Sequence, residues 1–105
     1  MDLTITDIKA LLGSDTSPDP LDPRRGECLL IRTVTMTVTG RVVDSSPCWI
    51  VLDDAAWIAD TGRFADAIAS GTLTEVEPMG CGVRVARGSI VDVAPWRHDL
   101  PLTQK

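Results

Sequence analysis

The chain has 105 residues, of which 44% are hydrophobic, and its formal net charge is −5. This length suits one domain with a single core, and the hydrophobic content excludes a disordered chain. The acidic balance argues against a general nucleic-acid binder, which needs a basic face, and the longest apolar run is far shorter than the roughly 20 residues of a membrane span.

The N-terminal part of the chain predicts a helix followed by an extended arm. Its hydrophobic residues recur at helical spacing: Ile5, Ile8, Leu11 and Leu12. Gly13 can end this helix, so we expect it within residues 1–13. Residues 14–26 contain three prolines and three aspartates, a composition typical of a linker or an extended arm.

Alternating residues predict the beginning of a sheet. Residues 33–39 read Thr-Val-Thr-Met-Thr-Val-Thr, and strict period-two alternation is typical of a strand with one buried face. Gly40 falls within this strand and predicts a bend or a bulge. We expect the strand to begin near Glu27 or Cys28, and the consecutive apolar residues 29–31 indicate burial on both faces.

The centre of the chain predicts a hairpin and an inserted helix. Residues 44–47 form a turn cluster ahead of a strand over residues 49–58. From residue 60 to residue 70 the period changes to that of a helix, with Asp60 or the next residue as its cap and Gly71 as its stop.

The last third of the chain predicts the strands that complete the sheet. We expect an extended segment over residues 72–76, a flexible turn over 78–82, and two strands over 83–88 and 89–93 that are hinged at Gly88. Short turns between neighbouring strands favour antiparallel pairing, and the edges of such a sheet need protection from aggregation.

The sequence therefore predicts a single domain over residues 1–105 of the mainly β class. We expect a small, strongly bent antiparallel barrel over residues 27–94, with an N-terminal helix and one inserted helix near residues 60–70. The polar segment 95–105 is expected to be a loose tail unless it docks on something.

Two motifs in this order resemble those of the Sm and Sm-like (LSm) family. The first is Gly-Arg-Val-Val at residues 40–43, then Asp44, then Ile-Val-Leu-Asp-Asp-Ala at residues 50–55. The second is Val-Arg-Val-Ala-Arg-Gly-Ser-Ile-Val-Asp-Val at residues 83–93. The resemblance implies five strongly bent strands after an N-terminal helix, and assembly of identical subunits into rings.

A further stretch, residues 52–64, is similar to uncharacterised phage-type proteins, some of them ring-forming and Sm-like. The chain departs from the Sm-like family at its RNA-contacting loop, where Ser-Ser-Pro-Cys-Trp at residues 45–49 lacks the expected asparagine. The inserted helix also interrupts a connection that is usually a short loop. Ring assembly is therefore a firmer implication of the resemblance than RNA binding.

A nucleic-acid site, if present, would use arginines around a pore: Arg41, Arg84 and Arg87, with Gly88 beside them. A tryptophan would provide the stacking platform. The structural alternative is that Gly88 permits a tight turn and that Arg87 makes a salt bridge.

The three tryptophans predict an interaction surface. Trp49 and Trp57 flank the central strand, and Trp96 follows the last one. A chain this small has little interior for three such side chains, and tryptophan is enriched at interface hot spots. We expect Trp57 or Trp96 to contact another subunit.

Other polar residues do not form a recognisable catalytic or metal site. Four aspartates could supply paired carboxylates: Asp53, Asp54, Asp60 and Asp66. Three widely spaced cysteines could join the single histidine around zinc: Cys28, Cys48, Cys81 and His98. Closely spaced ligand pairs are absent, and a lone histidine in a tail is expected to face solvent. We expect reduced thiols, no metal and no cofactor.

The sequence therefore predicts a non-enzymatic, self-assembling protein that forms a homo-oligomeric ring with a structural or scaffold role. The alternative is a module that binds RNA or single-stranded nucleic acid. Because residues 1–4 show no basic segment followed by an apolar stretch, we expect a cytoplasmic protein that does not bind membranes.

Overall fold

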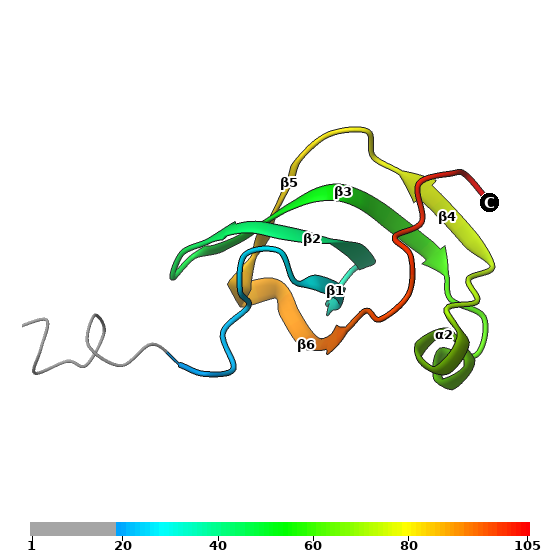
Figure 1. The fold of residues 1–105 in the computed structure, drawn as a ribbon, viewed down its shortest axis with the longest axis horizontal. Coiled ribbons are helices and arrows are strands. Elements are labelled where there is room, and N and C mark those ends of the chain that lie inside the picture. The colour runs from blue at the N-terminus through cyan, green and yellow to red at the C-terminus, as the bar shows by residue number, and fades with distance from the viewer. Residues whose placement is uncertain (1–18) are drawn as a thin grey trace, which may run out of the picture.

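The computed structural model describes residues 19–105, so the helix expected within residues 1–13 lies outside the described part. The elements follow in the order β1 (Cys28–Thr33), β2 (Thr37–Ser45), β3 (Trp49–Asp60), α2 (Phe64–Ser70), β4 (Glu75–Pro78), β5 (Val83–Ala86), the 3-10 helix η1 (Arg87–Ser89) and β6 (Ile90–Pro95). This confirms a mainly β fold with one inserted helix (Figure 1).

All strand pairs are antiparallel, and β3 is the strand around which the sheet bends. One edge of β3 pairs with β2, whereas the other edge pairs with β5 over its first part and with β4 over its last part. On the far side β1 lies between β2 and β6. Since β5 and β6 do not pair with each other, the sheet curls strongly but does not close into the expected barrel.

The alternating run over residues 33–39 is not one continuous strand, which corrects the sequence interpretation. The structure ends β1 at Thr33 and begins β2 at Thr37, with a tight turn between them. The Thr33 hydroxyl accepts the backbone N–H of Met36 at 3.0 Å and donates to its carbonyl at 2.9 Å. Threonine side chains can stabilise a turn in this way. The alternation of polar and apolar residues does not reveal whether such a turn forms in place of a continuous strand.

The bend predicted at Gly40 is confirmed by the pairing of β2 with β3. Between Thr39 and Arg41 the register shifts, because β3 carries one extra residue there. Asp54, within this bulge of β3, adopts the left-handed conformation with φ of 47°. A Cβ on Gly40 would lie 2.9 Å from the Cβ of Leu52, so glycine is what allows the two strands to approach.

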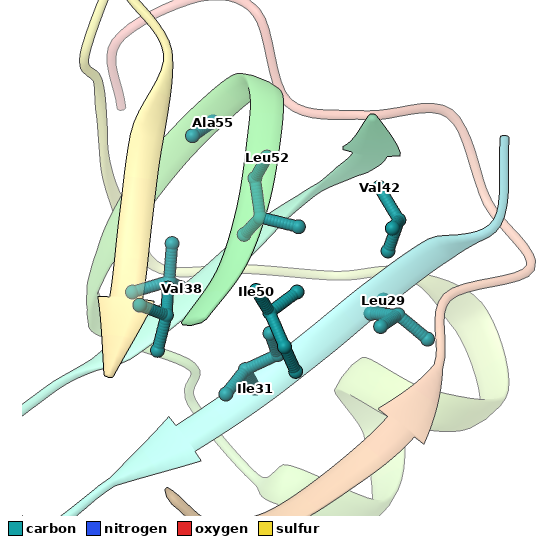
Figure 2. Packing of buried hydrophobic residues seen from close by; sticks show 8 residues of the cluster. Leu29, Ile31, Val38, Val42, Ile50, Leu52 and Ala55 are labelled. Carbon is teal, nitrogen blue, oxygen red and sulfur yellow. The ribbon is translucent and has the colours of Figure 1, made fainter. Parts of the chain in front are cut away.

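Two apolar clusters lie on opposite faces of the sheet. The first lies inside the curl, where side chains from β1, β2 and β3 converge (Figure 2): Leu29, Ile31, Val38, Val42, Ile50, Leu52 and Ala55. The second is on the outer face beneath α2 and the C-terminal segment, and it contains Leu30, Ala56, Ile58 and Trp96. Residues 29–31 are therefore covered on both faces, as predicted.

The helix begins later than expected. Strand β3 extends to Asp60, whose carboxylate accepts the backbone N–H of Gly62 at 2.8 Å. Asp60 thus stabilises the turn that precedes the helix, and the N-cap of α2 is Arg63 without a side-chain hydrogen bond. Gly71 ends the helix in the left-handed conformation, as predicted.

The tail docks on the domain, the alternative that the sequence left open. The indole of Trp96 is 4% exposed and donates to the carbonyl of Asp99 at 3.1 Å. Further along, Lys105 and Val76 exchange two backbone hydrogen bonds of 3.0 and 3.2 Å. The C-terminal segment (red) therefore returns alongside β4 and pairs with its outer edge (Figure 1).

Candidate functional site

Arg87 connects three segments that are distant in the sequence. Its Nε donates to the carbonyl of Ser46 at 2.6 Å, and its Nη2 donates to the Ser45 hydroxyl at 3.3 Å. Its Nη1 forms an ion pair with Asp22 at 3.2 Å. Arg87 thus joins η1, the turn between β2 and β3, and the proline-rich arm, which is the structural alternative stated for this residue.

Gly88 is not required by the backbone at its position. It lies within η1, and a Cβ added there would meet nothing within 4 Å. Its φ is outside the left-handed region, in contrast to Gly26, Gly62, Gly71 and Gly80. The turn between β5 and β6 therefore forms without the freedom that sequence analysis assigned to glycine.

Arg41 is held by the carboxylates of the β3 bulge. Its Nη1 lies 2.7 Å from Oδ2 of Asp54 and 3.5 Å from Oδ1 of Asp53. The hydrogen bond with Asp54 raises the pKa of the Arg41 guanidinium, so the group stays charged and paired. Both carboxylates therefore lie against the same guanidinium.

Arg84 differs from the other two arginines, because it has neither a hydrogen bond nor an ion pair with any side chain of residues 19–105. It lies on β5 directly opposite Val51 of β3. Together with Trp49, which is 42% exposed, it lines a groove of about 450 Å³ on the outer face of the sheet. Of the three arginines predicted for nucleic acid, only Arg84 has no ion-pair or hydrogen-bond partner among residues 19–105.

The two tryptophans expected at an interface have different environments. Trp57 is 43% exposed on β3, between Val38 of β2 and Glu77 of β4, so it can contact a partner. Trp96 lies in the outer cluster and has almost no surface left. The expectation that Trp96 contacts another subunit is therefore not supported by its burial.

The edge strand β6 has a feature that sequence analysis missed. Among the strands of residues 19–105, β6 pairs only with β1, and Val91 and Val93 lie along it with exposures of 62% and 41%. Val93 pairs with Ile31, which belongs to the inner cluster, so this valine extends the apolar interior towards the open edge, whereas Val91 is the extra residue at a register shift between β6 and β1. The alternation of valines over residues 91–93 was visible in the sequence. It suggests an interaction surface only because the structure shows that the outer edge of β6 has no neighbouring strand among residues 19–105.

The remaining candidates are dispersed. His98 is half-buried, and its Nε2 donates to the carbonyl of Ile68 at 2.8 Å, which corrects the expectation that it faces solvent. Cys28 is half-buried and on β1, whereas Cys48 and Cys81 are exposed in turns, and all three are free thiols. Within residues 19–105, no group of three or more His, Cys, Asp or Glu side chains is arranged to hold a metal ion.

Comparisons with known proteins return no match. No protein-family model, curated protein or solved structure matches this chain. In the part of the chain that the structure describes, no helix has the length and hydrophobicity needed to cross a membrane.

Proposed function

We propose that this protein is a non-enzymatic, Sm-like subunit that assembles with copies of itself into a ring. The sheet supports the Sm-like assignment in two ways. Strands β4 and β5 pair with the same edge of β3 and together take the place of one interrupted strand, which gives the five strand positions of that family. The first and last strands, β1 and β6, are neighbours, so the last strand follows the first one in the order of the sheet.

The observation that carries the proposal is the unpaired apolar edge at β6. Within residues 19–105, the outer edge of this strand has no neighbouring strand, and Val91 and Val93 are exposed beside it. Unpaired edges attract further strands, and most proteins protect them with charge, proline or a covering segment. Here β6 carries one charged residue, Asp92, which is paired with Arg32 of β1, and it ends in Pro95, while Val91 and Val93 stay exposed. A strand from a second copy would both complete the ladder and cover these valines.

The partner edge in this proposal is β5 of the next copy. In the described part of the chain, β5 pairs only with β3, whereas the outer edge of β4 is partly occupied by Lys105 of the same chain. Pairing β6 with β5 joins two different surfaces, and such a heterologous contact forms a closed ring when its rotation closes. The tail therefore leaves β5 as the acceptor edge.

Native mass spectrometry of Val91→Lys tests this proposal. A lysine at the centre of the contact places an unpaired charge among apolar groups, so we expect the variant to be monomeric or greatly reduced in subunit number. The matched control is Leu102→Lys, because Leu102 is also 62% exposed but lies in the tail. The control should retain the wild-type subunit number.

Two results would contradict the proposal. The first is a wild-type protein that is monomeric at micromolar concentration, because such a protein does not form a ring. Equal subunit numbers for the wild type and Val91→Lys would show that the assembly does not use β6.

The alternative function, binding of single-stranded nucleic acid, is favoured by one observation, the position of Arg84 beside Trp49. Two of its three arginines are neutralised by carboxylates, since Arg41 pairs with Asp53 and Asp54 and Arg87 pairs with Asp22. A gel-shift assay with oligo-U and oligo-A at moderate salt separates the two functions. No shift at high micromolar protein removes the alternative.

A further inference from the structure

Strands β4 and β5 lie one after the other along the same edge of β3, which gives the subunit two outer edges where a strand could add. Strand β5 pairs with the first part of β3, and β4 pairs with its last part. In the proposed ring, each copy would therefore bring one donor strand, β6, and two possible acceptors. The two acceptors differ, because within residues 19–105 only β4 has its outer edge bonded to backbone of the same chain.

The tail closes the outer edge of β4 at Val76. The backbone N–H of Lys105 donates to the carbonyl of Val76 at 3.0 Å, and the N–H of Val76 donates to the carbonyl of Lys105 at 3.2 Å. Two residues further along β4, Pro78 has no N–H to offer to another strand. Val76 is therefore the residue of β4 whose two backbone groups an added strand needs, and Lys105 takes both.

Side chains of the tail add two more hydrogen bonds to this contact. The amide nitrogen of Gln104 donates to Oε1 of Glu77 at 3.1 Å, and Nζ of Lys105 donates to the carbonyl of Leu73 at 3.4 Å. Gln104, Lys105 and Glu77 are all exposed, so the contact is polar and lies at the surface. Segments that bury few apolar groups open locally at a small free energy, without unfolding of the domain.

The preceding part of the tail is held more firmly. Trp96 and Leu100 pack in the outer cluster beneath the red segment of the ribbon (Figure 1). Leu102, between these anchors and the contact with β4, is 62% exposed. Residues 101–105 can therefore leave β4 while residues 96–100 stay in place.

We propose that residues 104 and 105 form a strap that closes the β4 edge against a second copy, and that the strand they exclude is β6. The inference rests on the proposed ring only in naming the incoming strand. Among the strands of residues 19–105, β6 has exposed valines beside an unpaired edge. With the strap in place each copy has one donor and one acceptor, as a closed ring of heterologous contacts requires.

Release of the strap changes the geometry that is open to β6. The bulge of β3 around Asp54 lies between the part that pairs with β5 and the part that pairs with β4. Since a bulge bends its strand, a strand added to β4 takes a different orientation from one added to β5. Two alternative contacts with different rotations close at different subunit numbers, so the assembly loses its single size.

Native mass spectrometry of Lys105→Pro tests the strap. Proline removes the N–H that donates to the carbonyl of Val76, so the β4 edge opens. We expect several subunit numbers for this variant where the wild type has one. Lys105→Ala is the matched control, because it keeps both backbone hydrogen bonds and loses only the bond from Nζ. The control should assemble as the wild type does.

A chain that stops at Thr103 provides a second variant, because it lacks the whole strap. Hydrogen exchange at the Val76 amide reports the release directly, since this amide donates to Lys105. We expect exchange about tenfold faster or more in this variant and in Lys105→Pro than in the wild type and Lys105→Ala.

Combining Lys105→Pro with Val91→Lys identifies the incoming strand. If β6 is that strand, the double variant shows only the species of Val91→Lys, and persistence of the additional species excludes β6. The two proposals fail separately. A monomeric wild type with an oligomeric Lys105→Pro contradicts the ring and supports the strap, whereas a wild-type ring whose size is unchanged in Lys105→Pro contradicts the strap alone.

Two outcomes overturn the inference. One is faster exchange at the Val76 amide with an unchanged subunit number, which would show that an open β4 edge accepts no strand. The other is wild-type protection of Val76 in both variants, which would show that residues 104 and 105 do not close the edge.

Discussion

Gly40 is the residue at which the close approach of two strands depends on the absence of a side chain. Leu52 and the carbonyl of Asp53 lie within 3.2 Å of the position that a Cβ would take. Neither a buried leucine in the inner cluster nor a strand backbone can move aside easily. The absence of a side chain at Gly40 therefore contributes to the sharp curl of the sheet.

Gly40→Ala should lower the free energy of unfolding by about 1–3 kcal/mol, the usual cost of overpacking a core. Urea denaturation followed by circular dichroism measures the change. Gly88→Ala is the matched control, because a Cβ there has open space, and it should be close to neutral. Equal stability of the two variants would contradict the role given to Gly40.

A second residue-scale effect concerns Asp92, which pairs with Arg32 across β6 and β1. The hydrogen bond from Arg32 lowers the pKa of the Asp92 carboxyl. A depressed pKa in the folded state stabilises the protein above the ordinary aspartate value of about 3.9, and that stabilisation is lost as the pH falls below it.

Asp92→Asn should therefore remove part of the acid sensitivity of the protein. Urea midpoints measured between about pH 6 and pH 2 should decrease less steeply for the variant than for the wild type. Because both side chains are more than 40% exposed, the difference should shrink in high salt. Parallel pH profiles for the two proteins would exclude a contribution from this pair.

At the scale of elements, the sequence predicted most strands and misjudged their limits. The strand from Trp49 to beyond residue 58, the two strands after Gly82 and the stop at Gly71 were all visible, because each has a strong local signal. The turn at residues 34–36 was not, since Thr33 reverses the chain through hydrogen bonds that leave the alternation intact. Nor could the pattern show that Asp60 would finish a strand instead of starting a helix.

The docked tail was also beyond the reach of local patterns. Trp96 and Leu100 are separated by polar residues and belong to no repeat, yet both pack in the outer cluster. Their burial depends on α2 and β4, which lie elsewhere in the sequence. The candidate site residues also differ in their environments. Arg84 and Trp57 are accessible at the surface, whereas Trp96 is buried and Arg41 is paired with Asp54.

Trp96→Ala should destabilise the domain by about 3–5 kcal/mol, as expected when a large buried aromatic side chain is removed. Thermal unfolding and hydrogen exchange at the Val76 amide, which bonds to Lys105, would measure this loss and the release of the tail. Arg97→Ala, at an exposed neighbouring position, should have little effect. A tail that stayed protected in Trp96→Ala would show that the indole does not hold it.

At the scale of the whole molecule, the proposed assembly through the open edge would make the stability of the protein depend on its concentration. A partner that binds only the folded state stabilises it by mass action, so an assembling protein unfolds at a higher temperature when it is more concentrated. We expect the wild type to show this concentration dependence in differential scanning calorimetry. Val91→Lys should unfold at a temperature independent of concentration, and a concentration-independent wild type would count against assembly in solution.

Gly71 shows how two parts of the chain constrain a single position. It ends α2 with φ of 74°, a conformation that asparagine also adopts readily in other proteins. Here the imidazole of His98 occupies the space beside it, and a Cβ would lie 2.7 Å from the ring. Asparagine could adopt the backbone conformation that ends the helix, but its Cβ would collide with His98. The residue that can end this helix is therefore restricted by a segment twenty-seven positions further along the chain.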